Sequence, residues 1–137
     1  MPNIQENNPK LGVMVDCSRN SVMNVEALRS LIPVLSKIGY TTLMLYTEDT
    51  YEVNGEPYFG YLRGRYSKAE LKGIDRIAAA SGVELVPCIQ TLAHLNQIFR
   101  YPVYEDIHDA QDVLLAEEEK TYALIEKMFQ TCAECFT

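Results

Sequence analysis

The chain has 137 residues, which is enough for one domain with a hydrophobic core of its own. Its formal net charge of −7 argues against nucleic acid or an anionic membrane as a partner, because the sequence offers no basic patch to pair with phosphates. It contains no apolar run as long as a membrane span, and its start, MPNIQENNPK, lacks the apolar segment of a secretory signal. We therefore expect a globular, cytoplasmic protein with a flexible N-terminus at residues 1–10 and one domain at 11–137.

Three strands alternate with three helices in the pattern of apolar residues. The strands are expected at residues 11–16, 42–46 and 84–89, and the helices at 24–38, 67–81 and 117–136. Asn24 suits the N-cap of the first helix and Gly39 its C-terminal end, while Pro33 should kink this helix or begin a new turn. Ser67 and Glu70 have the spacing of a capping box. Near-continuous apolar strands between helices indicate an α/β fold, with parallel strands covered by helices.

Two long polar connections follow the second and third strands. The first, residues 47–66, contains four tyrosines and a phenylalanine, and its Asn54-Gly55 pair could turn a small hairpin. These rings could form a lid or a sugar-binding wall, or they could simply pack the loop against the domain; the sequence alone favours neither. Open α/β sheets and (β/α) barrels bind ligands beyond the C-terminal ends of their strands, so both connections are candidate site segments.

The four cysteines divide into two pairs. Cys17 and Cys88 fall in or beside predicted strands and are expected to be small buried side chains. Cys132 and Cys135 form a C-x-x-C, which could bind a metal or be redox-active. Because this pair lies in a helical apolar pattern and no second C-x-x-C exists, we expect its thiols to line a core face, and we predict no metal site and no cofactor. Free thiols also fit a reducing compartment.

Four segments together resemble the start of the catalytic barrel of glycoside hydrolase family 20, the exo-acting β-N-acetylhexosaminidases. They are VMVDCSRN, LMLYTEDTYEV, GEPYFGYLRGRYSKAEL and VPCIQTLAHLNQIFR. The resemblance extends from about residue 11 to residue 137. It implies the first three βα units of a (β/α)8 TIM barrel, that is, a partial barrel with parallel strands and covering helices.

The resemblance implies a sugar-binding role for residues after the first two strands. Arg19 matches the arginine that grips hydroxyls of the terminal sugar, since a guanidinium can donate to two hydroxyls at once. Glu48 and Asp49 match the acidic pair of the second strand, which would hold Arg19 or accept from a sugar hydroxyl. Without the family context, Arg19 would be a surface residue of a turn, and Asp49 would equally be a turn residue.

The loop after the third strand matches the family motif Asp-x-x-x-His-x-Asn at two of its three positions. Gln90, His94 and Asn96 hold those positions, and Gln90 replaces the acid. An amide cannot stabilise a histidinium as a carboxylate does, which argues against a charged His94. His108 matches no family position and is expected to face solvent.

The family's catalytic pair, an adjacent Asp-Glu after the fourth strand, has no match, because the dipeptide Asp-Glu occurs nowhere in the chain. In the family the Glu is the general acid, and the Asp orients the substrate's own 2-acetamido group for attack on the anomeric carbon. We therefore expect an N-terminal fragment of a retaining exo-β-N-acetylhexosaminidase, inactive by itself, which recognises terminal GlcNAc or GalNAc. The alternative is a non-catalytic carbohydrate-binding or interaction protein. A phosphate-binding α/β domain is disfavoured, since no Gly-rich loop follows a strand.

Three parallel strands would leave two sheet edges unpaired and one face uncovered. We expect that face to carry Val13, Val15, Met44 and Leu85 and to promote self-association, most simply as a two-fold dimer. The other possibility is that the aromatic loop folds over the open side of a monomer.

Overall fold

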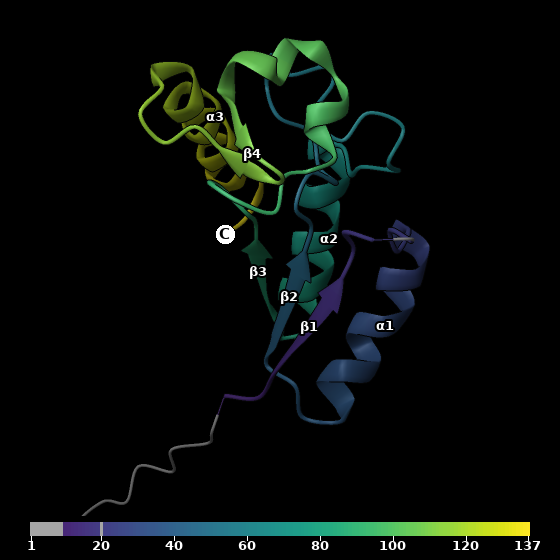
Figure 1. Ribbon diagram of the computed structural model, residues 1–137. Coiled ribbons are helices and arrows are strands. Elements are labelled where there is room, and N and C mark those ends of the chain that lie inside the picture. Colours follow the sequence, from purple (N-terminus) through teal and green to yellow (C-terminus); the bar gives the residue numbers. More distant parts are fainter. Residues whose placement is uncertain (1–9, 20) are drawn as a thin grey trace, which may run out of the picture.

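The structure, a computed structural model, describes residues 10–19 and 21–137, and it contains one three-stranded parallel sheet in the order β1-β2-β3. The strands are β1 (Gly12–Asp16), β2 (Thr42–Tyr46) and β3 (Glu84–Cys88). All three run towards the same end of the domain, where the loops and short helices of residues 89–118 gather (Figure 1). The predicted α/β fold is confirmed, whereas the N-terminus predicted to be flexible lies outside the described residues except for Lys10.

The helices begin and end close to the predicted positions. They are α1 (Val25–Lys37), α2 (Lys68–Ala80) and α3 (Glu119–Cys135). Asn24 accepts a hydrogen bond from the Ala27 amide at 2.8 Å, and Ser67 and Glu70 form the predicted capping box. α1 continues through Pro33 to Lys37 rather than restarting there, and Arg29, whose carbonyl loses its donor, is exposed to water.

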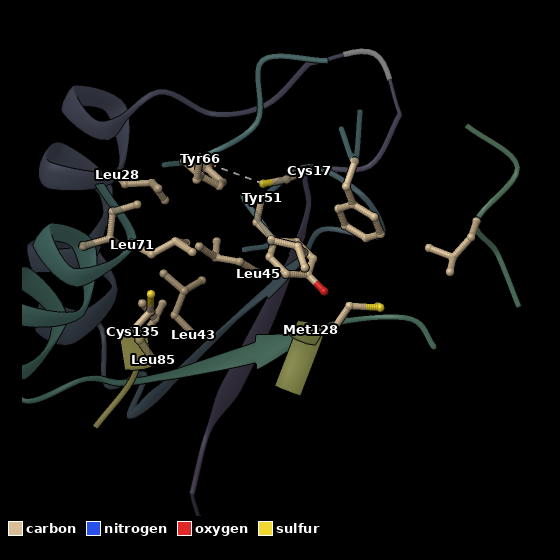
Figure 2. Close-up of a cluster of buried hydrophobic side chains, with 14 of the residues drawn as sticks. Cys17, Leu28, Leu43, Leu45, Tyr51, Tyr66, Leu71, Leu85, Met128 and Cys135 are labelled. Carbon is tan, nitrogen blue, oxygen red and sulfur yellow. Dashed lines mark hydrogen bonds between the residues drawn. The ribbon is translucent and has the colours of Figure 1, made fainter. Parts of the chain in front are cut away.

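The core lies between the sheet and the helices. The register places Val13, Leu43 and Leu85 in one row across the sheet, and Leu43 is fully buried against the helices, as Figure 2 shows. Val13 and Val15 also pack against this core. The prediction that Val13, Val15 and Leu85 occupy the uncovered face is therefore wrong. Successive residues of a strand point to opposite faces, so of the four predicted residues only Met44 lies on the other side.

The other face of the sheet is covered by no helix among residues 10–19 and 21–137 (Figure 1). Met14, Met44 and Val86 form one row across it, and 51% of Met14 is exposed. The next row towards the C-terminal ends of the strands holds Asp16 and Tyr46. The open face is therefore apolar in the middle and polar where the strands end.

The aromatic loop, residues 47–66, folds back on the domain through a series of turns. Tyr51 and Tyr66 form an isolated parallel bridge, and Asn54-Gly55 lies in a turn without the predicted hairpin. Both tyrosines and Phe59 are buried, with the rings of Tyr51 and Phe59 in edge contact at 5.4 Å. These three rings therefore hold the loop against the rest of the domain.

The segment between β3 and α3 contains structure that the sequence did not predict. Two 3-10 helices, η1 (Ile98–Arg100) and η2 (Pro102–Ile107), precede a short antiparallel pair, β4 (His108–Ala110) and β5 (Val113–Leu114). The described helices include none long and apolar enough to cross a membrane.

The cysteines are all free, and Cys17 and Cys135 are buried while Cys88 and Cys132 are half-buried. Burial raises the pKa of the Cys132 thiol to about 11, with the neighbouring Cys135 adding to the rise. The reactive thiolate is thus strongly disfavoured at neutral pH, which argues against a redox role for the C-x-x-C.

Candidate functional site

A turn at the end of β1 places Arg19 beside the neighbouring strand. One carboxylate oxygen of Asp16 accepts hydrogen bonds from the Ser18 amide at 2.8 Å and the Ser18 hydroxyl at 2.7 Å. These two bonds, the hydroxyl's first, lower the pKa of Asp16, because they stabilise its charged form. The Asp16 side chain therefore shapes the turn that carries Arg19 over the strand ends.

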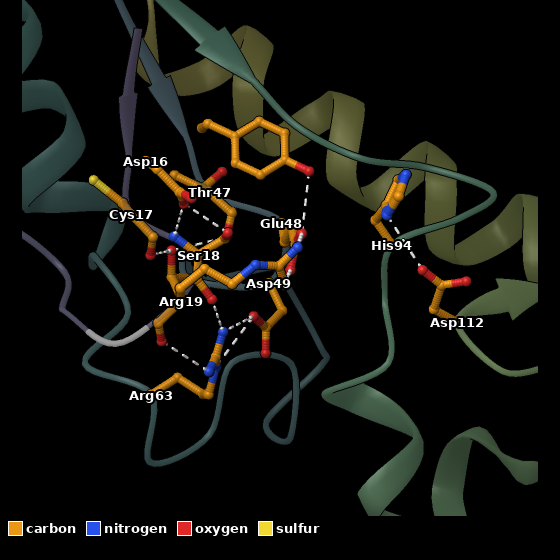
Figure 3. Close-up of polar contacts among 12 residues, drawn as sticks. Asp16, Cys17, Ser18, Arg19, Thr47, Glu48, Asp49, Arg63, His94 and Asp112 are labelled. Carbon is orange, nitrogen blue, oxygen red and sulfur yellow. Dashed lines mark hydrogen bonds and ion pairs between the residues drawn. The ribbon is translucent and has the colours of Figure 1, made fainter.

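Arg19 and Glu48 form a two-pronged ion pair (Figure 3). Nη1 of Arg19 lies 3.1 Å from Oε2 of Glu48, and Nη2 lies 3.0 Å from Oε1. The Glu48 side chain is only 2% exposed, whereas that of Arg19 is 60% exposed. A buried carboxylate thus orients a guanidinium whose outer side remains open to solvent.

Tyr46 holds the same carboxylate from the open face of the sheet. Its hydroxyl donates to Oε1 of Glu48 at 3.1 Å. Burial raises the pKa of Tyr46 and the bond to Glu48 raises it further, while Gln90 and Arg19 act in the opposite direction. The Glu48 backbone has a φ of +51°, a left-handed conformation that non-glycine residues rarely adopt, so the chain bends sharply here.

A second ion pair, between Asp49 and Arg63, lies next to the first (Figure 3). Nε and Nη2 of Arg63 lie 3.3 and 3.2 Å from Oδ1 of Asp49. Arg63 also donates to the carbonyls of Ser18 and Arg19, so it ties the aromatic loop to the turn after β1. Burial raises the pKa of Asp49, and the charge of Arg63 opposes the rise. Asp49 therefore reaches the Arg19 backbone through Arg63 rather than binding the Arg19 side chain.

His94 lies apart from these ion pairs and faces a different carboxylate (Figure 3). Its Nδ1 is 3.2 Å from Oδ2 of Asp112, a residue of the turn between β4 and β5. Gln90 replaces the family's acid at its position in the motif, and Asp112 presents a carboxylate to the imidazole from another part of the same connection.

The remaining predicted residues have weaker connections. Gln90 is half-buried just beyond β3, near the Tyr46 hydroxyl whose pKa it affects. Asn96 is exposed, and its side chain makes no hydrogen bond to another described residue. His108 is exposed as expected, but its ring stacks on Phe99 with centroids 3.9 Å apart.

The site has the chemistry of a hydrogen-bonding surface. Within residues 10–19 and 21–137, no group of three or more His, Cys, Asp or Glu side chains could hold a metal ion. The exposed guanidinium of Arg19 instead offers N–H donors at the strand ends, and buried acids fix its position. Sequence reasoning missed Arg63, Tyr46 and Asp112; each lacks a distinguishing pattern, although Asp112 belongs to the unusual long connection after β3.

Solved β-N-acetylhexosaminidases share the fold of this chain. One such crystal structure superposes with a TM-score of 0.81 at 17% identity, covering 93% of this chain and 34% of that one. The N-acetyl-β-hexosaminidase of Streptomyces plicatus gives 0.79 at 21% identity, covering 92% and 30%. A family 20 exo-β-N-acetylglucosaminidase of Vibrio harveyi gives 0.81 at 18%, covering 93% and 26%.

Two curated relatives are similar in sequence, although no family model matches the chain. Hexosaminidase D of Bos taurus is 24% identical over an alignment of 115 residues that covers 78% of this chain and 32% of the relative. Hexosaminidase D of Homo sapiens is 22% identical over an alignment of 113 residues that covers 80% of this chain and 23% of the relative. The chain thus spans a third or less of these relatives. The predicted resemblance is confirmed: the chain shares its fold with part of the family 20 β-N-acetylhexosaminidases and resembles Hexosaminidase D in sequence.

Proposed function

We propose that the chain forms the first three βα units of a family 20 (β/α)8 barrel and that Arg19 binds the terminal N-acetylhexosamine. The observation that carries this proposal is the Arg19–Glu48 pair, in which a buried acid holds an exposed guanidinium at the strand ends. Two of the five guanidinium N–H groups point to Glu48, which leaves others for vicinal sugar hydroxyls. The open sheet face with its row of Met14, Met44 and Val86 suits the wall of a barrel.

The chain's own part in the reaction is binding and orientation. Glu48 keeps the guanidinium in place, Tyr46 at the end of β2 holds Glu48, and Arg63 fixes the loop that carries Glu48 and Asp49. The general acid and the acetamide-orienting Asp belong to an Asp-Glu pair that these 137 residues lack. In a whole barrel, substrate-assisted hydrolysis with retention would use that pair while Arg19 holds the sugar. The free thiols support a reducing, cytoplasmic location for such a protein.

Binding of the methyl β-glycoside of GlcNAc tests the proposal directly on this chain. In ¹H–¹⁵N NMR spectra we expect the sugar to shift amides around Arg19 and Glu48. Arg19→Ala should abolish these shifts, whereas Arg29→Ala, which removes an exposed arginine of α1, should leave them unchanged. Absence of binding, or equal binding by the Arg19→Ala variant, would contradict the proposal.

The chain alone should not hydrolyse chromogenic β-N-acetylhexosaminides. General acid catalysis is typically worth about 10²–10⁴-fold, and the acid is missing. Turnover that co-purifies with the chain and disappears in the Arg19→Ala variant would show that another group supplies the acid.

The second candidate is a carbohydrate-binding protein without catalysis, for which the exposed guanidinium of Arg19 held by Glu48 would serve equally well. Reading the gene beyond Thr137 separates the two. A following strand that ends in Asp-Glu supports the hydrolase, and its absence supports the binding protein.

A further inference from the structure

Two consecutive turns at the tip of the aromatic loop share one geometry but differ at their third residue. The Tyr61 amide donates to the Tyr58 carbonyl at 3.2 Å, and the Arg63 amide donates to the Gly60 carbonyl at 3.1 Å. The third residue of the first turn is Gly60, with a φ of +65°, and that of the second is Leu62, with a φ of +59°. Turns that need a positive φ at their third residue normally have glycine there, so Leu62 is the exception.

Packing requires the glycine of the first turn but not the leucine of the second. A Cβ on Gly60 would lie 2.1 Å from the Asp49 carbonyl oxygen. Leu62 instead projects into solvent with 86% of its surface exposed, the largest fraction of any large apolar side chain in residues 10–19 and 21–137. It does not belong to the described hydrophobic core or to the side chains that pack against that core. Core packing therefore does not explain the leucine.

The leucine side chain at this position is unfavourable in two ways. A left-handed backbone costs free energy for a residue that carries a Cβ, and an apolar side chain left in water gains nothing from burial. Glycine would avoid both costs. Backbone outliers of this kind persist where the surrounding structure enforces them, and they cluster at ligand-binding sites. The exposed side chain of Leu62 therefore points to a contact with a group outside the described chain.

Neighbouring hydrogen bonds fix the turn of Leu62 beside the Arg19 site. The next residue, Arg63, donates from its side chain to the Arg19 carbonyl at 3.4 Å. The preceding residue, Tyr61, accepts a hydrogen bond on its carbonyl from the Tyr101 hydroxyl at 3.1 Å. Leu62 is therefore held next to the turn that carries the Arg19 guanidinium.

We propose that Leu62 contacts an apolar aglycone, an alkyl or aryl group, of the glycoside whose terminal N-acetylhexosamine binds Arg19. This inference rests on the proposed function and adds to it a class of substrate. An exo-acting site holds the terminal sugar innermost, so the aglycone leaves towards the loops beyond the strand ends, where Leu62 projects into solvent. A single side chain falls far short of the roughly 800 Å² that each partner of a stable protein interface buries, which favours a small ligand over a protein.

The test compares binding of the methyl and n-butyl β-glycosides of GlcNAc to this chain in ¹H–¹⁵N NMR titrations. A fully buried methylene is worth about 4-fold in affinity, and one leucine covers only part of a butyl chain. We therefore expect the butyl glycoside to bind about 3- to 10-fold more tightly than the methyl glycoside. Leu62→Gly should bind both equally, with the affinity of the wild type for the methyl glycoside, whereas Leu62→Met should keep the preference.

Thermal melting separates a binding role of Leu62 from a structural one. Leu62→Gly relieves the left-handed backbone but gives the unfolded chain more freedom, and these effects oppose each other. The melting temperature of Leu62→Gly should therefore stay close to that of the wild type. A large drop would show that the leucine stabilises the loop, and it would overturn the inference.

Ile38→Ser is the matched control, because Ile38 is 63% exposed at the end of α1, and it should change neither affinity. Equal binding of both glycosides to the wild type, or a butyl preference that survives Leu62→Gly, overturns the apolar contact and leaves the proposed function intact. Butyl glycoside binding that persists in Arg19→Ala would show that the alkyl chain binds without the sugar, which overturns its assignment as an aglycone. Absence of binding by either glycoside overturns this inference together with the proposed function.

Discussion

Asp112 presents its carboxylate to His94, with Oδ2 3.2 Å from Nδ1, although the sequence offers only Gln90 at the position where the family has an acid. The two residues come from different parts of the connection between β3 and α3, and the β4–β5 turn brings them together. A carboxylate at Nδ1 fixes the orientation and tautomer of an imidazole. The His94 backbone has a φ of +61°, so the chain accepts an unfavourable conformation at the residue that makes this contact.

If the proposed function holds, Asp112→Ala in a whole enzyme that contains this chain is expected to lower kcat/KM by up to about 10-fold, since a hydrogen bond contributes about 0.5–1.5 kcal/mol and about 1.4 kcal/mol in the barrier is tenfold in rate. Stability should change by less than about 1 kcal/mol, because both side chains are substantially solvent-exposed. Steady-state kinetics and urea unfolding measure the two effects. Asp109→Ala, an exposed acid of β4, is the control. Equal kinetics in both variants would show that the His94–Asp112 pair has no part in the reaction.

Glu48→Gln should weaken sugar binding and lower the pKa of Tyr46 at the same time. The bond to the charged carboxylate contributes to the raised pKa of Tyr46, but burial contributes more, so the pKa should fall only part of the way to its ordinary value. NMR with ¹³C-labelled tyrosine follows this titration directly. Losing a charge from a buried hydrogen-bonded group should also cost about 1–3 kcal/mol of stability. Glu126→Gln, on the exposed side of α3, should change neither quantity; an unchanged Tyr46 titration in Glu48→Gln would contradict the contact.

The elements with regular patterns could be predicted, and the contacts between loops could not. Asn24, Ser67 and Glu70 have local signatures, so the starts of α1 and α2 follow from the sequence. Val13, Val15 and Leu85 were placed on the wrong face because an apolar run without alternation does not identify the helix-covered side.

In the candidate site, too, the residues within family motifs could be predicted, whereas a partner from a distant part of the chain could not. Arg19 and Glu48 are near strand ends, where the family motifs point, and they meet. Their supporting partner Arg63 comes from a turn of the aromatic loop, and its position depends on how the whole of residues 47–66 folds back. No residue spacing predicts how this loop folds back, because an irregular loop of this length has no periodic pattern of apolar residues.

Asp16 should make folding stability depend on pH in the acid range. Its pKa is lowered in the folded state, chiefly by the Ser18 hydroxyl, so the unfolded chain binds a proton more readily. The stability it contributes is therefore present above its ordinary pKa of about 4 and is lost as the pH falls through the lower, folded value. Because Asp16 is largely exposed, we expect the effect to be less than about 1 kcal/mol.

Thermal unfolding of wild type and Asp16→Asn at pH 7 and pH 2.5 checks this prediction. The variant should melt lower at pH 7, and the difference should shrink at pH 2.5. Asp109→Asn should track the wild type at both pH values. A difference that is equal at both pH values would mean that the lost contact does not depend on the carboxylate charge.

The isolated chain should self-associate through the uncovered side of its sheet. β1 and β3 each pair only with β2 among the described strands, so each leaves an edge that can accept another strand. Met14 is 51% exposed on the open face, and burial of apolar surface contributes roughly 25 cal/mol per Å². A two-fold dimer would cover the edges or the open faces with the same surface of a second copy.

Light scattering over a concentration series measures this association, and Met14→Lys tests where it occurs. A lysine in the middle of the open face should shift the dimer towards monomer, because its charge would have to be buried in an apolar contact. Val34→Lys adds the same charge at a residue of α1 that is also 51% exposed, and it should leave the association unchanged. A monomer mass at every concentration, together with one cooperative thermal transition, would contradict the dimer. It would show instead that the domain tolerates an exposed sheet face, with the buried core between sheet and helices sufficient for folding.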